Sequence, residues 1–265
     1  MYEEYWGLSE KPFLSTPNPR FLYNSTQHQE ALTRLIYTIQ EGLGAGMLTG
    51  IFGCGKTVIA QTLLQQLSGE KYKIANIANP RLDDVDLLRM IVHHLGFTEP
   101  PRSKADVLNI LHDILLNNMR NGKETVIIID EAHSIDNDSI FEELRLLLNF
   151  QLEDRFLLTL LLVGQPELKQ KIDKNIQLEQ RISVKCYLGS LSAEDTQNYI
   201  IHRLAVANKT EPIFAKKAMS LIFSYSGGIP RRINRLCDMC LLAGFAKKID
   251  RVDDDVVQAE IKELE

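Results

Sequence analysis

The sequence predicts an α/β fold with a central parallel sheet of five strands, followed by a small all-helical subdomain. Up to about residue 190, short apolar runs alternate with helical patterns. These runs are apolar on both faces, which suits parallel strands covered by helices. Beyond residue 190 only helical patterns continue. The predicted strands are 47–51, 72–78, 125–129, 156–163 and 183–188.

The helical patterns complete the predicted organisation. A helix begins near Thr26 and ends before Gly42. Thr26 and Gln29 fit a capping box at the start of this helix, and Ser103 and Asp106 open a further predicted helix over 105–120. Residues 1–24 are rich in aromatics and prolines and show no period, so we expect an irregular N-terminal arm. The predicted domains are therefore this arm, an α/β core over 25–190 and a helical lid over 191–265.

Composition narrows the function classes. The chain has 265 residues and a net charge of −5, with a pI near 5.8. A dedicated nucleic-acid binder is usually basic, so this charge disfavours that class, although a local basic patch stays open. The longest apolar run, 156–163, falls short of the roughly 20 residues of a membrane helix. With no signal peptide visible at the N-terminus, we expect a cytoplasmic protein.

A glycine-rich loop carries the main functional signal. Residues 50–57 read GIFGCGKT and match the phosphate-loop motif G-x-x-x-x-G-K-[ST] between a predicted strand and a predicted helix. Backbone N–H groups of such a loop, together with the helix N-terminus, bind the phosphates of ATP. The alternative is a plain glycine-rich turn. The predicted nucleotide-binding residues are Gly50, Gly53, Cys54, Gly55, Lys56 and Thr57.

Within this loop, each polar side chain has an expected role. Lys56 reaches the β- and γ-phosphates, and the Thr57 hydroxyl binds Mg²⁺. Cys54 lies beside a helix N-terminus, a setting that lowers the pKa of a thiol, so we expect a reactive cysteine.

Two carboxylates follow a central strand. Asp130 and Glu131 come directly after the apolar run 126–129, and ligands of open α/β sheets collect at that edge. We expect Asp130 to hold Mg²⁺ and Glu131 to polarise the attacking water. The alternative is a strand end with two solvated acids. His133 completes a D-E-A-H string, which we interpret as local structure.

Several further motifs identify a family. The segments YWGL (5–8), KPF (11–13), TPNPRFLYNS (16–25), His28 and EAL (30–32) resemble the opening of the general secretion pathway protein A family of AAA+ ATPases. GQPEL (164–168), EQRI (179–182) and GIPRRIN (228–234) fit the same family. The resemblance covers essentially the whole chain, and its N-terminal part is the most family-specific.

This resemblance implies three more site residues. Gln165 resembles sensor 1, which orients the attacking water. Arg181 resembles an arginine finger that reaches a neighbouring subunit's γ-phosphate, and Arg231 resembles sensor 2 of the helical lid. In the plainer alternatives Gln165 caps a helix, Arg181 is a solvated charge, and Arg231 lies on an exposed helix face.

The resemblance also implies cofactors and partners. We expect ATP and Mg²⁺, an ATP-dependent homo-oligomer in a hexameric ring or filament, and a protein partner in a secretion or envelope system, with a peripheral position at the inner membrane. Longer family members continue into a membrane span and a periplasmic part that this sequence lacks. Two alternatives stay open: a DNA-associated ATPase switch similar to transposition regulators, and a non-hydrolysing scaffold.

Overall fold

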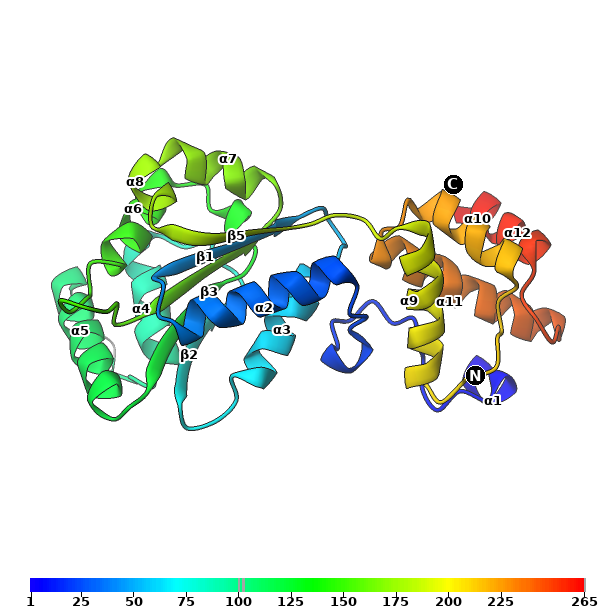
Figure 1. Ribbon diagram of the computed structural model, residues 1–265, viewed down its shortest axis with the longest axis horizontal. Helices are drawn as coiled ribbons and strands as arrows, with labels where there is room; N and C mark the ends of the chain where they lie inside the picture. The colour runs from blue at the N-terminus through cyan, green and yellow to red at the C-terminus, as the bar shows by residue number, and fades with distance from the viewer. Residues whose placement is uncertain (100, 102, 265) are drawn as a thin grey trace. The chain divides into compact units, whose positions relative to one another are not determined.

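The computed structural model describes residues 1–99, 101 and 103–264, which form two compact units (Figure 1). The helical unit comprises Met1–His28, Gly53–Val58 and Gly189–Glu265. The sheet unit comprises Gln29–Phe52 and Ile59–Leu188.

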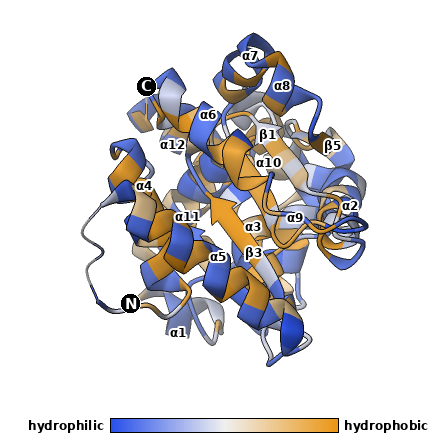
Figure 2. Ribbon diagram, turned by 90° about the vertical axis from the view of Figure 1, so that its left-hand side faces the viewer, coloured by the Kyte–Doolittle hydropathy of each residue, from blue (hydrophilic) through white to orange (hydrophobic). Residues whose placement is uncertain are grey.

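The sheet unit is built on five parallel strands, as predicted, in the order β2-β3-β4-β1-β5. β1, β3 and β4 are central and consist mainly of buried residues, because helices cover both faces of a parallel sheet. Figure 2 shows most of β3 in orange, the colour of hydrophobic residues. The strands are β1 (Ala45–Gly50), β2 (Tyr72–Ile77), β3 (Glu124–Ile129), β4 (Thr159–Gly164) and β5 (Ile182–Leu188).

The largest apolar core lies between the sheet and three amphipathic helices, α4, α5 and α6, whose buried faces repeat at helical spacing. α5 begins where Ser103 and Asp106 predict, and in the structure these two residues exchange side chain-to-backbone bonds as a capping box. The remaining helices of this part are short or start in the helical unit. The bounds are α2 (Thr26–Gln40), α3 (Lys56–Gln66), α4 (Asp84–His94), α5 (Lys104–Arg120), η2 (Ala132–Ser134), α6 (Asp138–Leu147), α7 (Glu167–Lys174) and α8 (Ile176–Glu179).

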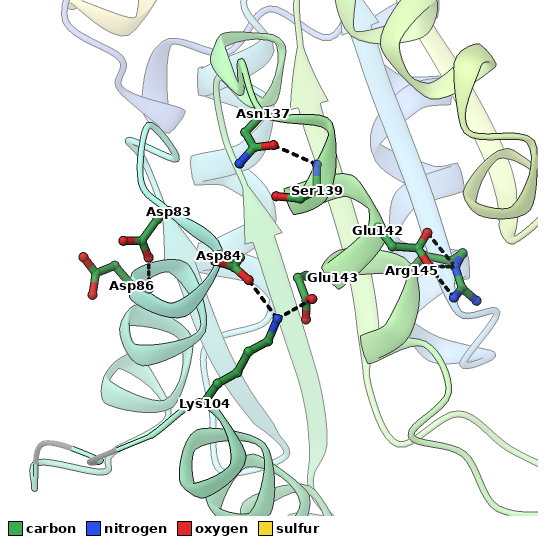
Figure 3. A network of polar contacts seen from close by, with 9 residues as sticks. All are labelled: Asp83, Asp84, Asp86, Lys104, Asn137, Ser139, Glu142, Glu143 and Arg145. Carbon is green, nitrogen blue, oxygen red and sulfur yellow. Dashed lines mark hydrogen bonds and ion pairs between the residues drawn. The ribbon is translucent and has the colours of Figure 1, made fainter.

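A lysine at the first turn of α5 connects the three core helices (Figure 3). Lys104 Nζ lies 2.8 Å from Asp84 Oδ2 on α4 and 2.5 Å from Glu143 Oε1 on α6. Asp83 caps α4 and Asn137 caps α6, each accepting a bond from a backbone N–H in the first turn. The Lys104 ammonium beside two carboxylates therefore links the first turns of α4 and α5 to the middle of α6.

One strand is shorter than predicted. β4 begins at Thr159, whereas the apolar run that predicts it starts at Phe156. Phe156 instead forms an isolated antiparallel bridge with Gln151, and its ring packs over Gly44, where an added Cβ would lie 3.0 Å from a ring carbon. An aromatic ring that fills a glycine gap gives the same apolar signal as a buried strand residue.

The helical unit has its own core. It is formed by α9 (Ala193–Val206), α10 (Lys216–Ser226), α11 (Pro230–Lys247) and α12 (Asp254–Leu264). The N-terminal segment, expected to be irregular, contains α1 (Tyr2–Trp6) and the 3₁₀-helix η1 (Pro19–Phe21). Tyr2, Trp6 and Phe13 belong to this core, so the segment is a packed part of the unit.

Contacts of Trp6 hold the five-residue helix α1 against α11. Its indole N–H donates to the Leu241 carbonyl oxygen at 2.9 Å, and a Cβ added at Gly244 would come within 2.6 Å of the ring. A glycine on α11 thus leaves the space that the indole fills. Within the described part of the chain, no helix combines the length and the apolarity needed to cross a bilayer.

Candidate nucleotide-binding site

The phosphate loop follows β1 and leads into α3, as its motif predicts. Gly53 and Gly55 adopt φ angles of +82° and +105°, which side chain-bearing residues rarely adopt. The Gly53 carbonyl accepts a hydrogen bond from the Arg231 N–H at 3.2 Å, and a Cβ on Gly53 would lie 2.8 Å from Arg231 Cβ. The predicted sensor-2 arginine therefore contacts the loop through its own backbone.

A buried histidine also contacts the loop. His28, 4% exposed, lies in the first turn of α2, and its Nε2 is 2.9 Å from the Cys54 carbonyl oxygen. Its Nδ1 is 2.7 Å from Ser25 Oγ. Because a carbonyl can only accept, Nε2 carries the proton and Nδ1 accepts from the Ser25 hydroxyl. Burial lowers the pKa of His28, which favours this neutral form.

The loop side chains differ in part from expectation. Lys56 is 6% exposed at the first position of α3. The expectation of a reactive thiol at Cys54 is wrong, because this residue is fully buried and burial raises the pKa of its thiol. The nearby Lys56 ammonium lowers that pKa, but by less than burial raises it. Desolvation of the thiolate outweighs the helix N-terminus.

The carboxyl ends of β1, β3 and β4 meet at one edge of the sheet, because these strands are parallel neighbours in register. Gly50 ends β1, Asp130 follows β3, and Gln165 follows β4. Asp130 is 7% exposed, and its N–H donates to the Ile77 carbonyl oxygen at 2.9 Å. The sheet thus places these predicted residues at the same edge, as expected.

Glu131 has an unusual backbone. Its φ of 53° is left-handed, a conformation that is costly for a residue with a side chain and that recurs at functional sites. The Glu131 N–H donates to Asp130 Oδ1 at 2.8 Å. The Glu131 side chain is 46% exposed.

His133 joins the two strand ends. Its Nδ1 is 3.3 Å from the Gln165 backbone N, and its Nε2 is 2.8 Å from Gln165 Nε2 and 3.5 Å from Glu131 Oε2. The Gln165 N–H makes Nδ1 an acceptor, so the proton of a neutral ring is on Nε2, and the Gln165 amide must turn its oxygen toward it. The Lys171 ammonium holds this turn by donating to the carbonyl oxygens of His133 and Ile135.

The role of His133 was missed in the sequence, where it reads as local structure. The signal available was its place in the D-E-A-H string, two residues after Glu131. Nothing in that string indicates contact with Gln165, which is 32 residues further on.

Arg181 lies apart from these residues. It directly precedes β5, whose start is at the amino edge of the parallel sheet, opposite the edge that carries Asp130 and Gln165. Among the residues that the structure describes, no hydrogen-bond partner is present for its buried Nη1 atom. Arg181 is thus separated from the carboxylates of its own sheet.

The sequence of this chain matches a known protein family. The AAA domain family matches residues 39–172, which contain the phosphate loop and the carboxylates after β3. The chain belongs to the AAA family. This AAA protein is also 43% identical over 253 residues to general secretion pathway protein A of Aeromonas hydrophila. The match covers 93% of the chain and 45% of that relative, so the chain spans less than half the relative's length.

Solved structures confirm the fold of this AAA protein. The Aeropyrum pernix ORC2 protein, in ADPNP–ADP complexes, matches 94% of the chain and 72% of its own with a TM-score of 0.67 and 19% identity. The Aeropyrum pernix ORC1 protein in complex with DNA matches 97% of the chain and 70% of its own with a TM-score of 0.73 and 17% identity. At these identities the likeness concerns the fold alone.

Proposed function

We propose that this AAA protein binds ATP with Mg²⁺ and hydrolyses it to ADP and phosphate. The phosphate loop carries this proposal, because Gly53 and Gly55 hold left-handed conformations that glycine adopts readily, as expected for the glycines of this motif. A nucleotide phosphate needs such a concave surface of N–H groups at a helix N-terminus. The carboxylates at the sheet edge supply the second requirement, oxygen ligands suited to Mg²⁺.

Each residue then has a role in hydrolysis. Lys56 and the loop N–H groups bind the phosphates, while Thr57 and Asp130 hold Mg²⁺, which neutralises developing charge on the phosphoryl group. Glu131 is the general base: its carboxylate accepts the proton of the attacking water, and its exposed side chain leaves room for that water. Gln165 orients the water. Arg231, as sensor 2 of the helical lid, contacts the bound nucleotide.

Removal of the Lys56 ammonium tests nucleotide binding. In Lys56→Ala, we expect no measurable affinity for a fluorescent ATP analogue, because a fixed cation among the phosphate contacts is lost. Lys73→Ala, on an exposed position of β2, is the matched control and should bind as the parent does. Unchanged affinity in Lys56→Ala would contradict the assignment of the loop.

We further propose that this ATPase acts as a homo-oligomer, a hexameric ring or filament, on a protein partner of a secretion or envelope system. The 43% identity to general secretion pathway protein A supports this proposal. ATPase activity measured with and without double-stranded DNA tests it: turnover unaffected by DNA agrees with a protein partner, and strong stimulation by DNA favours the transposition-type alternative.

A further inference from the structure

The orientation of the phosphate loop depends on contacts outside the motif. In a trans peptide unit the C=O and the following N–H point in opposite directions. Fixing one carbonyl of the loop therefore fixes the direction of the next N–H. The loop needs its N–H groups on the phosphate side, so its carbonyls must find donors on the other side.

Two consecutive carbonyls of the loop have such donors. The Gly53 carbonyl accepts from the Arg231 N–H, which directs the Cys54 N–H the opposite way. The Cys54 carbonyl accepts from His28 Nε2, which directs the Gly55 N–H the opposite way. A backbone group supplies the first donor, but the second depends on the side chain of His28.

The His28 side chain is itself held in place. Ser25 Oγ contacts its Nδ1, and a Cβ on Gly55 would lie 3.2 Å from its Nε2, so the ring fits against the loop with little free space. The preceding residue fixes the start of α2. Gln27 accepts from the Gly189 N–H at 2.9 Å and donates to the Ser190 carbonyl oxygen at 3.1 Å.

We propose that His28 is a positioning residue that orients the Gly55 N–H of the phosphate loop and thereby sets the affinity for the nucleotide phosphates. This inference rests on the proposed function. His28 does not touch the nucleotide in this mechanism; it acts through the Cys54 carbonyl. Burial of the neutral ring agrees with this role, since the fixed tautomer keeps Nε2 as a donor.

Two substitutions separate donation from packing. Gln can place an amide N–H near the position of Nε2, whereas Met fills similar space with no donor. His28→Met should weaken binding of a fluorescent ATP analogue about tenfold, the size of one net hydrogen bond. His28→Gln should recover most of the affinity. Ser25→Ala removes the hydroxyl that fixes the tautomer of the ring and should weaken binding by a smaller factor. It replaces His28→Met as the test if that variant does not fold.

The controls make each outcome decisive. His202 lies half-buried on α9 in the same unit, and the described chain offers its Nε2 no partner, so His202→Met makes the same chemical change away from the loop and should leave affinity unchanged. Lys56→Ala reports on the proposed function: if it still binds, that function fails and the inference falls with it. If Lys56→Ala abolishes binding while His28→Met stays within twofold of the parent, the inference alone is overturned. Equal losses in His28→Met and His28→Gln would likewise overturn it, because packing rather than donation would then matter.

Discussion

The imidazole of His133 contacts both the backbone and the side chain of Gln165, with Nδ1 at 3.3 Å from the Gln165 N and Nε2 at 2.8 Å from its side-chain Nε2. The same Nε2 is 3.5 Å from a carboxylate oxygen of Glu131. One N–H group therefore faces both the proposed water-orienting residue and the proposed base. If the Gln165 side chain moved away, the His133 Nε2–H group could donate to the Glu131 carboxylate instead.

This relationship predicts non-additive effects on turnover. His133→Ala and Gln165→Ala should each lower kcat by roughly 10- to 100-fold, and the double variant should be little worse than the poorer single variant. The KM for ATP should change little in His133→Ala, because the proposed mechanism gives this histidine no contact with phosphate. A double-mutant cycle in kcat measures the coupling; fully additive losses would show that the two residues act separately.

Glu131→Gln should keep nucleotide affinity and lose turnover. The amide retains the shape of the side chain but cannot accept the proton of water, and general bases contribute roughly 10²–10⁴ in rate. Glu167→Gln, at an exposed position two residues after Gln165, is the matched control and should retain activity. Steady-state phosphate release measures both, and more than about half the parental rate in Glu131→Gln would exclude Glu131 as the base.

Arg181 should act on a neighbouring subunit, since it lies at the opposite sheet edge from Asp130. Arg181→Ala should bind ATP and hydrolyse it poorly, because an arginine finger contributes roughly 10³–10⁵ in rate. Mixed with Lys56→Ala, it should regain part of the activity, as some interfaces then pair an intact loop with an intact arginine. Co-assembly of the two variants without recovered ATPase activity would show that Arg181 has a structural role instead.

His28 should make stability depend on pH. Its pKa is lowered in the folded protein, so below about pH 6.5 the unfolded chain binds a proton that the folded chain does not, and the free energy of unfolding falls as pH falls. The slope for one such group is at most about 1.4 kcal/mol per pH unit. Urea unfolding at pH 7.5 and 5.5 should show a smaller loss in His28→Met than in the parent; an equal loss would assign the effect to other groups.

Lys104→Met should destabilise the sheet unit. It removes the cation shared by Asp84 and Glu143, whose side chains are 31% and 13% exposed. Lys104 itself is 36% exposed, so we expect only about 1 kcal/mol in urea unfolding. The Lys104 ammonium lowers the pKa of Asp84, so the loss should shrink as pH falls and Asp84 is protonated. Lys169→Met removes a more exposed pair with Asp173 and should have a smaller effect; equal effects would contradict the inter-helix role of Lys104.

The parts that could be predicted from sequence are those that depend on local pattern. The apolar run before Asp130 and the glycine spacing around Lys56 predict a strand, a loop and their chemistry, because backbone geometry imposes both patterns. The contacts of His28 with Cys54 and of His133 with Gln165 join residues 26 and 32 positions apart, and no local period encodes them. The prediction of a reactive thiol at Cys54 is wrong for a related reason. The helix N-terminus beside Cys54 is visible in the sequence, but the burial of the thiol is a property of the assembled fold.

Trp6 is the sole tryptophan of the sequence, and it is 5% exposed against Gly244 with its N–H donated to Leu241. The protein therefore contains a single indole fluorophore, placed where α1 meets α11. When the indole is excited selectively, its emission reports on this contact of the helical unit. Release of α1 would shift the emission to longer wavelength and expose the ring to quenchers, so the docking of this five-residue helix can be followed in solution without any label.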